Sequence, residues 1–255
     1  MFSFEIACDE EHHDLLIAEL WDQGCAGISE LSDGRLRAFF EDTADRAALL
    51  TRYSDATART EEQRNWVEAS QSLLEPMNVG NRFFLVPEWR DDAAPPGRFR
   101  IIVNPGMAFG TGVHETTQLC LEALEDFLKP GMTVLDVGTG SGILAEAAGL
   151  LGAGKVFACD VDPVAVGIAR ARCHRSFTGS AGAVRSDVAE VVLANISPES
   201  IIQLAPDLIR SLRRGGVLLA SGFEAHEVEL VKAVLPQMRE VRRKGTWVLA
   251  VIPRS

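Results

Sequence analysis

The hydrophobic pattern of the first sixty residues alternates between strand and helix periodicity. Apolar and polar residues alternate in the strand-like segments, and apolar residues recur every three or four positions in the helix-like ones. In chain order the pattern predicts a strand at 2–8, a helix at 10–24, strands at 26–31 and 35–40, and a helix at 43–53. Asp33-Gly34 between the two central strands is a hairpin signal. This β-α-β-β-α order predicts a small α+β domain of ferredoxin-like type.

The rest of the chain follows a different pattern. Residues 58–76 are polar and are expected to include a linking helix. Strands are predicted at 81–89 and 97–106, on either side of a loop that contains Pro-Pro-Gly. From residue 115 onward strand and helix patterns alternate. Such alternation is typical of a Rossmann-like, doubly wound parallel sheet, so the chain is expected to be an α/β protein with a small additional domain.

Composition excludes several classes of protein. The net charge is −11, and residues 1–60 hold thirteen Asp and Glu against five Arg. Such a surface repels nucleic acid and attracts basic partners, although a merely solvated face is the simpler reading. No apolar run is long enough for a membrane span and no signal peptide is recognisable, so we expect a cytoplasmic protein. The odd number of scattered cysteines argues against disulfides and against a zinc site. They are Cys8, Cys25, Cys120, Cys159 and Cys173.

A glycine-rich turn follows the apolar segment 133–137. Its glycines, Gly138, Gly140 and Gly142, are spaced Gly-x-Gly-x-Gly, and Ile143 stands where the dinucleotide fingerprint needs a third glycine. The Gly-Lys-Ser/Thr of a P-loop is also missing. We expect Gly138 and Gly140 to let a ligand approach bare backbone, and the third glycine to allow close packing of the next helix.

Two acids flank this turn and narrow the choice of ligand. Asp136 just before it is awkward for a pyrophosphate and well suited to an ammonium group. Asp160 ends the next predicted strand, where a carboxylate accepts hydrogen bonds from ribose hydroxyls. A ligand with a ribose, a cationic amino-acid end and no phosphate fits better than NAD. S-adenosyl-L-methionine is such a ligand.

The segment 104–124 begins as a glycine-rich loop and passes into an amphipathic helix from about His114. Thr116 and Thr117 are expected in its first turn, where they either cap the helix or bind a polar ligand end. His114 is a candidate base, but a cap or a hydrogen-bond donor is the commoner role. Phe109 in the loop either packs under a cofactor or fills core.

Asn195 ends the apolar run 191–194. Ligands bind beyond the carboxyl ends of parallel strands, so Asn195 is a candidate site residue. A buried amide without a partner would cost about 1–3 kcal/mol, and a structural partner in the next turn is the alternative reading.

Four stretches together resemble the ribosomal protein L11 methyltransferase family. They are NPGMAFGTGVHETT, VLDVGTGSGILAEAA, DVDP and VVLANI, and the terminal GTWVLAVI is similar to that family's closing strand. The resemblance implies methylation, up to trimethylation, of lysine side-chain amines and of the N-terminal amine of ribosomal protein L11. It places the family's cofactor contacts on Thr117, Gly138, Asp160 and Asn195.

The resemblance also assigns the domains. Residues 1–60 would form the acidic substrate-recognition domain, 61–95 a linker helix and the start of the catalytic region, and 96–255 a class I methyltransferase domain. Backbone groups near Ser180 would bind the adenine. Without a heptad pattern in the chain, we expect a monomer with L11 as its basic protein partner, and no direct contact with nucleic acid or membrane.

The chemistry requires orientation more than a strong base. Orientation alone is worth up to roughly 7–11 kcal/mol, and a desolvated amine beside a sulfonium loses its proton readily. We therefore expect Asn195 to orient the amine, while Phe109 and the loop around Thr111 close over the methyl donor.

Three alternatives remain open. A methyltransferase for another protein or a small molecule would share every cofactor residue. A cofactor-binding interaction module without catalysis is a different class of function. A dehydrogenase is disfavoured by Ile143 and Asp136.

Overall fold

The computed structural model describes most of the chain in two compact units, residues 1–73 and 74–255. The described residues are 2–7, 16–17, 19–20, 23–25, 27–31, 35–40, 42–53, 56–60, 75–104 and 114–255. The predicted linker helix, Phe109 and Thr111 lie outside them. In the described part, no helix is both long and apolar enough to cross a membrane.

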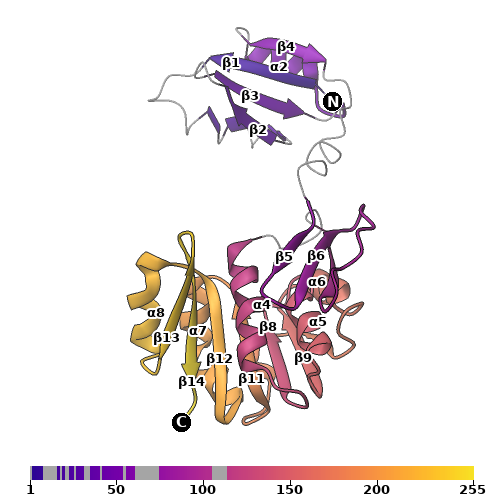
Figure 1. Ribbon diagram of the computed structural model, residues 1–255. Coiled ribbons are helices and arrows are strands. Elements are labelled where there is room, and N and C mark those ends of the chain that lie inside the picture. The colour runs from indigo at the N-terminus through magenta and orange to yellow at the C-terminus, as the bar shows by residue number, and fades with distance from the viewer. Residues whose placement is uncertain are drawn as a thin grey trace. The chain divides into compact units, whose positions relative to one another are not determined.

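Unit 1 contains a four-stranded antiparallel sheet (Figure 1). Its strands, in the order β2-β3-β1-β4, are β2 (Gly27–Glu30), β3 (Arg35–Phe40), β1 (Phe2–Ala7) and β4 (Thr57–Thr60). Residues 16–17 and 19–20 are helical, and α2 (Arg46–Arg52) begins at the N-cap Asp45. Alternate residues of β1 and β3, among them Phe4 and Leu36, are fully buried in the core of the unit. This strand order is the ferredoxin-like one that the sequence predicted.

Strand β4 was not predicted. Residues 58–60 were read as the start of a polar stretch, although the predicted first domain, residues 1–60, includes them. Ala58 packs against the core of unit 1, and Arg59 lies opposite Ser3 of β1. The Arg59 guanidinium contacts the Glu5 carboxylate of β1 at 3.2 Å. Arg59 is polar because its side chain pairs with the buried carboxylate of Glu5 on the neighbouring strand. The sequence pattern of β4 alone does not reveal this pairing.

Glu5 is the ionic centre of unit 1. Its side chain is 1% exposed and is paired with Arg35, Arg37 and Arg59. The hydrogen bond from Arg37 and the charges of all three guanidinium groups hold the pKa of Glu5 below its usual value.

Unit 2 is built on a seven-stranded sheet in the order β10-β9-β8-β11-β12-β14-β13 (Figure 1). The five neighbouring strands β10, β9, β8, β11 and β12 are parallel to one another. Strand β14 is antiparallel to both β12 and β13. The strands are β8 (Thr133–Val137), β9 (Lys155–Asp160), β10 (Ser176–Thr178), β11 (Ala189–Asn195), β12 (Leu212–Glu224), β13 (Glu240–Lys244) and β14 (Trp247–Pro253). The chain builds outward from β8 to β10 and then returns to β11 on the other side of β8. A ligand site is expected at this reversal, beyond the carboxyl ends of β8 and β11.

Helices cover both faces of this sheet. The helical segments are α4 (Glu115–Phe127), α5 (Ile143–Leu150), α6 (Pro163–Ala169), η1 (Ala181–Ala183), α7 (Pro198–Ser211), η2 (Ala225–Glu227) and α8 (Val228–Val234). One apolar core joins α4 and α5 to one face of the sheet, and a second joins α7 and α8 to the other. Because both faces are covered, the central strands are almost uniformly apolar, as their sequences predicted.

A three-stranded sheet adds to the α4 side of unit 2. It consists of β5 (Met77–Val79), β6 (Phe83–Pro87) and β7 (Phe99–Val103), and the sequence analysis missed β5. The Glu125 carboxylate of α4 accepts hydrogen bonds from the backbone N–H groups of Asn81 (2.9 Å) and Arg82 (2.8 Å) in the β5–β6 turn. This contact joins residues that are 43 or more positions apart in the sequence. It fixes β5, which is too short to show a strand pattern of its own.

We predict that Glu5→Gln lowers the melting temperature of the full chain at pH 7 and flattens its dependence on pH. Because the folded-state pKa of Glu5 is depressed, its stabilising contribution is present above the unfolded-state pKa of about 4.3 and is lost as the pH falls through the folded value. Thermal melts at pH 7 and pH 3 measure this. The matched control is Glu19→Gln, whose carboxylate is 49% exposed and lies 3.5 Å from Arg52. An unchanged pH dependence in Glu5→Gln would contradict the role given to Glu5.

Candidate functional site

The turn after β8 is shaped by neighbouring backbone. Gly138, Gly140 and Gly142 all have positive φ, at 71°, 52° and 81°. A Cβ on Gly138 would lie 2.1 Å from Cγ2 of Ile196, and one on Gly142 would lie 3.0 Å from Cα of Ala169. Glycine is therefore needed for both conformation and space. The contact of Gly142 with α6 confirms the expected close packing beside the helix that follows.

The end of β9 holds this turn in place. The backbone N–H groups of Gly138 and Thr139 both donate to the carbonyl of Cys159, at 2.9 and 3.0 Å. Asp160 accepts from the N–H of Gly140 through Oδ2 (2.9 Å) and from that of Asp162 through Oδ1 (3.0 Å). A carboxylate offers about four acceptor positions, so two neutral N–H donors leave Asp160 with capacity for hydroxyl groups.

Asp136 lies beneath the turn and is 1% exposed. Its Oδ2 accepts a hydrogen bond from the Thr139 hydroxyl at 2.6 Å, while its Oδ1 is buried without a partner in the described part of the chain. Burial raises the pKa of Asp136 to about 6, and the Thr139 hydroxyl opposes this rise. An orphaned carboxylate oxygen of this kind is matched chemically by a cationic, hydrogen-bonding group such as an ammonium.

Two cysteine thiols share this environment. Burial, together with the charge of Asp136, raises the pKa of the Cys120 thiol and raises that of Cys159 to about 12. Both side chains are fully buried. They therefore act as small apolar core residues, as expected, and not as nucleophiles.

The first turn of α4 meets the end of β11. His114 is the N-cap of α4, and its Nδ1 accepts from the Thr116 N–H at 3.3 Å and lies 2.8 Å from the Thr116 hydroxyl. Thr117 is 1% exposed, and its Oγ1 accepts from Nδ2 of Asn195 at 3.4 Å. His114 is therefore the residue that caps α4. The hydrogen-bond partner expected for the Asn195 side-chain amide is Thr117 on α4, and not a group in the turn after β11.

The structure thus brings together six predicted site residues at the carboxyl ends of the central strands. They are Thr117, Asp136, Gly138, Gly140, Asp160 and Asn195, with Gly140 bonded to Asp160. The other two, Phe109 and Thr111, belong to residues 105–113, outside the described part.

Sequence reasoning missed one side chain beside this group. The indole of Trp247, the first residue of β14, lies 4.6 Å from the His114 imidazole between ring centroids, in an edge-to-face arrangement at 67°. Trp247 is 120 residues or more from α4 along the chain. In the sequence it was noted only as part of the closing strand.

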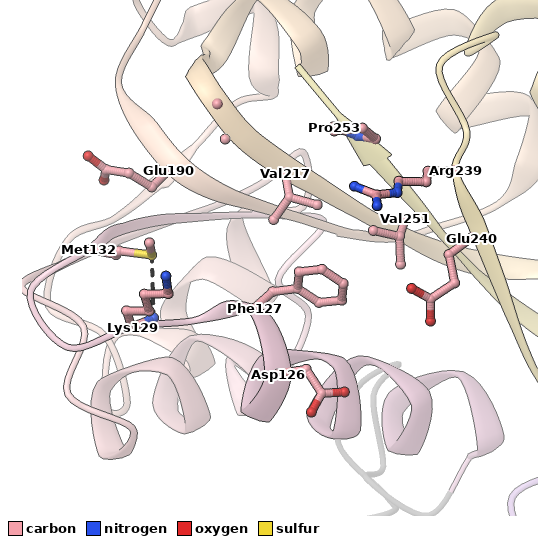
Figure 2. A pocket seen from close by; sticks show the side chains of 12 residues that line it. Asp126, Phe127, Lys129, Met132, Glu190, Val217, Arg239, Glu240, Val251 and Pro253 are labelled. Atoms are coloured by element: carbon pink, nitrogen blue, oxygen red, sulfur yellow. Dashed lines mark hydrogen bonds between the residues drawn. The ribbon is translucent and has the colours of Figure 1, made fainter. Parts of the chain in front are cut away.

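A separate pocket of about 510 Å³ lies at the opposite edge of the sheet. Figure 2 shows Phe127, Val217 and Val251 in its middle, with charged side chains around them. Two of its acids, Asp126 and Glu240, are both paired with Arg242. The pocket is lined by the start of β12 and the end of β14, and no predicted site residue contributes to it.

Comparison with known proteins decides the family. The model for "Ribosomal protein L11 methyltransferase (PrmA)" matches residues 28–254. The chain belongs to this family. The L11 methyltransferase of Pelobacter propionicus is 41% identical over 215 residues, which cover 77% of this chain and 69% of that protein. The L11 methyltransferase of Pelotomaculum thermopropionicum is 39% identical over 219 residues, covering 79% and 71%.

A solved structure agrees. The ribosomal protein L11 methylase of Lactobacillus delbrueckii subsp. bulgaricus superimposes with a TM-score of 0.64 at 31% identity, covering 71% of this chain and all of that one. Membership of the family makes this chain an S-adenosylmethionine-dependent methyltransferase with a Rossmann-like domain.

The residues on this edge fit that cofactor. The spare acceptor capacity of Asp160 matches a ribose, and the unpaired oxygen of Asp136 matches an ammonium group. The glycine turn offers a surface without side chains to a ligand that carries no phosphate. The sequence prediction of S-adenosyl-L-methionine is confirmed at the level of the family.

We predict that Gly138→Ala lowers stability and weakens S-adenosylmethionine binding by more than about tenfold. A left-handed φ costs a residue with a Cβ roughly 1–2 kcal/mol, and the new methyl would overlap Ile196. Melting temperature and titration calorimetry measure the two effects. Gly167→Ala is the control, since nothing lies within 4 Å of its added Cβ. Wild-type affinity and stability in Gly138→Ala would refute the fit.

We also predict that Asp136→Asn flattens the pH dependence of stability of the cofactor-free protein. The folded-state pKa of Asp136 is raised to about 6, so stability that is present below the unfolded value of about 3.9 falls as the pH rises through 6. The loss attributable to Asp136 is about 1–3 kcal/mol. Denaturant unfolding at pH 4, 6 and 8 tests this, with the exposed Asp162→Asn as control. A slope unchanged by Asp136→Asn would contradict the assignment.

Proposed function

We propose that this protein transfers methyl groups from S-adenosyl-L-methionine to amines of ribosomal protein L11. The acceptors are lysine side chains and the N-terminal amine, each methylated up to three times. Two relatives with about 40% identity carry the name ribosomal protein L11 methyltransferase. The observation that carries the proposal is the convergence of the glycine turn, Asp160 and the Thr117–Asn195 pair at one edge of the sheet.

Each residue has a distinct role in binding. Asp160 accepts hydrogen bonds from the ribose hydroxyls, and the backbone of Gly138 and Gly140 lies against the cofactor. Asp136 balances the charge of its ammonium group, because one of its buried carboxylate oxygens has no hydrogen-bond partner within the described part of the chain. Thr117 contacts the cofactor while it fixes the amide of Asn195.

The adenine is proposed to lie between the start of α6 and the η1 segment. Val161 directly follows Asp160 and is 75% exposed, a large exposure for a β-branched apolar residue beside a binding site. Across from it, the N–H of Gly179 donates to the carbonyl of Asp160 at 2.8 Å, which brings Ser180 to the same edge. Backbone groups at Ser180 are therefore suited to the adenine amine, and Val161 to its face.

Asn195 orients the amine that is methylated. Its Nδ2 is engaged by Thr117, which leaves the side-chain oxygen as an acceptor. This oxygen, or a neighbouring backbone carbonyl, is proposed to fix the lone pair of a neutral amine. When bound, the cofactor supplies a methyl group activated by a sulfonium, which an amine takes by in-line displacement. The chain supplies orientation and a site with little water, and these account for most of the barrier reduction. Phe109 and the segment around Thr111 are proposed to close over this site.

Unit 1 is proposed to dock the basic substrate protein. Residues 1–73 contain sixteen Asp and Glu against six Arg, so −10 of the net charge of −11 lies there, and residues 74–255 are nearly neutral. Opposite charge steers association and is weakened by salt. We expect a monomer that works in the cytoplasm without binding nucleic acid. If the acidic residues only form a solvated face, which is the simpler reading of the charge, the rate of L11 methylation will not depend on unit 1.

Labelled S-adenosyl-L-methionine and purified L11 test the proposal. Wild type is expected to transfer label to L11, with mass increments of one to three methyl groups per amine. Asn195→Ala is expected to lower kcat by about a hundredfold, a larger effect than its weakening of cofactor binding, because misplaced reactants lose most of the benefit of orientation. Label in other proteins only would support a methyltransferase of different specificity. Cofactor binding without transfer to any acceptor would support a non-catalytic module.

Removal of residues 1–73 tests the docking role. We expect cofactor affinity to persist and methylation of intact L11 to fall to background, with the wild-type KM for L11 rising at higher salt. Unimpaired methylation by the shortened chain would show that the acidic unit is only a solubilising surface.

A further inference from the structure

The β13–β14 hairpin places one aromatic ring at the carboxyl edge of the sheet. Trp247 pairs with Lys244 across a two-residue turn in which Gly245 has φ of 59°. The carbonyl of Thr246 in the same turn accepts from the N–H of Ala225 at 2.9 Å. The hairpin tip is therefore anchored to η2, and Trp247 is held in one position.

The Trp247 side chain lies on the same face of the sheet as Asn195. Leu193 and Leu249, two residues before Asn195 and two after Trp247, both belong to the core on the α4 side, and side chains two apart in a strand share a face. Only β12 separates the two strands. Leu249 is level with Asn195 across β12, and Trp247 lies two residues further along the sheet edge. Two strand spacings of about 4.8 Å and two residue rises of about 3.3 Å put the two Cα atoms roughly 12 Å apart. A lysine side chain reaches about 6 Å from Cα to Nζ, so an amine at Asn195 leaves its stem and main chain near Trp247.

The charges beside the ring favour a cation. Glu224 lies directly opposite Trp247 in the β12–β14 register, and its Oε2 is 3.3 Å from Nδ1 of His226. The charge of the neighbouring cation, Lys244, is balanced by the Glu122 carboxylate at 2.6 Å, and its Nζ also donates to Oε1 of Gln118 at 2.9 Å.

The Trp247 side chain is partly accessible. It is partly exposed, and its ring meets that of His114 in an edge-to-face arrangement. No hydrogen bond from the indole N–H is present within the described part of the chain. The side chain thus offers partly exposed aromatic surface and a donor.

We propose that Trp247 and Glu224 form the wall that receives the cationic side chain of the substrate residue. The inference rests on the proposed methylation of lysine amines. The indole attracts the charged end of the side chain by cation–π interaction and packs against its alkyl stem. The Glu224 carboxylate, which also caps η2, adds a negative charge beside it. His114 is a positioning residue that keeps the ring upright against the start of α4.

This wall has a particular consequence for successive methylation. Each methyl group removes one N–H donor from the amine, so hydrogen bonds to Asn195 or Glu224 become fewer. The attraction of the indole face for the cation remains, since quaternary ammonium groups are favoured ligands of aromatic rings. Trp247 is therefore expected to matter most for the later methyl transfers.

Kinetics of Trp247→Ala and Trp247→Phe on L11 test the wall. Loss of the ring is expected to raise KM for L11 three- to thirtyfold and to shift products toward mono- and dimethyl-lysine. Phe keeps an aromatic face and is expected to restore most of both. Cofactor affinity by calorimetry and the melting temperature should stay near wild type. Glu224→Gln is expected to raise KM less, and Glu229→Gln, whose carboxylate is 84% exposed and paired with Lys232, serves as its control.

Two results would overturn the inference while leaving the proposed function intact. One is wild-type KM and product distribution in Trp247→Ala. The other is a parallel loss of cofactor affinity and melting temperature, which would mean that the ring only supports the start of α4.

If wild type transfers no methyl to L11, the proposed function fails, and a binding measurement still tests the wall. Nα-acetyl-Nε-trimethyl-lysine methylamide is then titrated into wild type and Trp247→Ala. Binding by wild type that is lost in the variant supports the inference, and equal binding or none overturns it.

Discussion

Unit 2 depends on one steric constraint, the close approach of three chain segments at the turn after β8. Ile196, which follows β11, occupies the space that a side chain on Gly138 would need. Ala169 of α6 leaves no room for a side chain on Gly142. The turn accepts this only because its glycines adopt positive φ. The result is a surface of bare backbone beside two carboxylates, at the point where the strand order reverses.

The two carboxylates occupy very different environments. Asp160 is satisfied by two backbone N–H groups near the surface, whereas Asp136 is buried with one oxygen unpaired. The first is therefore ready for neutral hydroxyl groups, and the second destabilises the empty site until a cation approaches it. A pyrophosphate would add negative charge next to a buried acid. The geometry thus separates this family from dinucleotide-binding enzymes with the same sheet, as the spacing of the glycines had predicted.

Patterns within one segment were predicted well, and contacts across the sheet were not. The strands and helices of the larger unit, the glycine turn and Asp160 follow from periodicity and spacing. Strand β4 was missed because its polar face is stabilised by Glu5. Strand β5 was missed because it is short and is fixed through the following turn, where Glu125 of α4 accepts from two backbone N–H groups. The Thr117–Asn195 bond and the Trp247–His114 contact arise from sheet order, which a single sequence does not display. The adenine and methyl-donor contacts near Ser180 and Phe109 stay predictions.

The edge beyond β8 and β9 is suited to a phosphate-free, cationic adenosine compound. Titration calorimetry of the cofactor-free protein with S-adenosyl-L-methionine and, separately, with NAD distinguishes the two kinds of ligand. We expect saturable one-site binding of S-adenosyl-L-methionine and no measurable heat from NAD at the same concentrations. Saturable binding of NAD, with none of the sulfonium compound, would show that this edge accepts a dinucleotide instead.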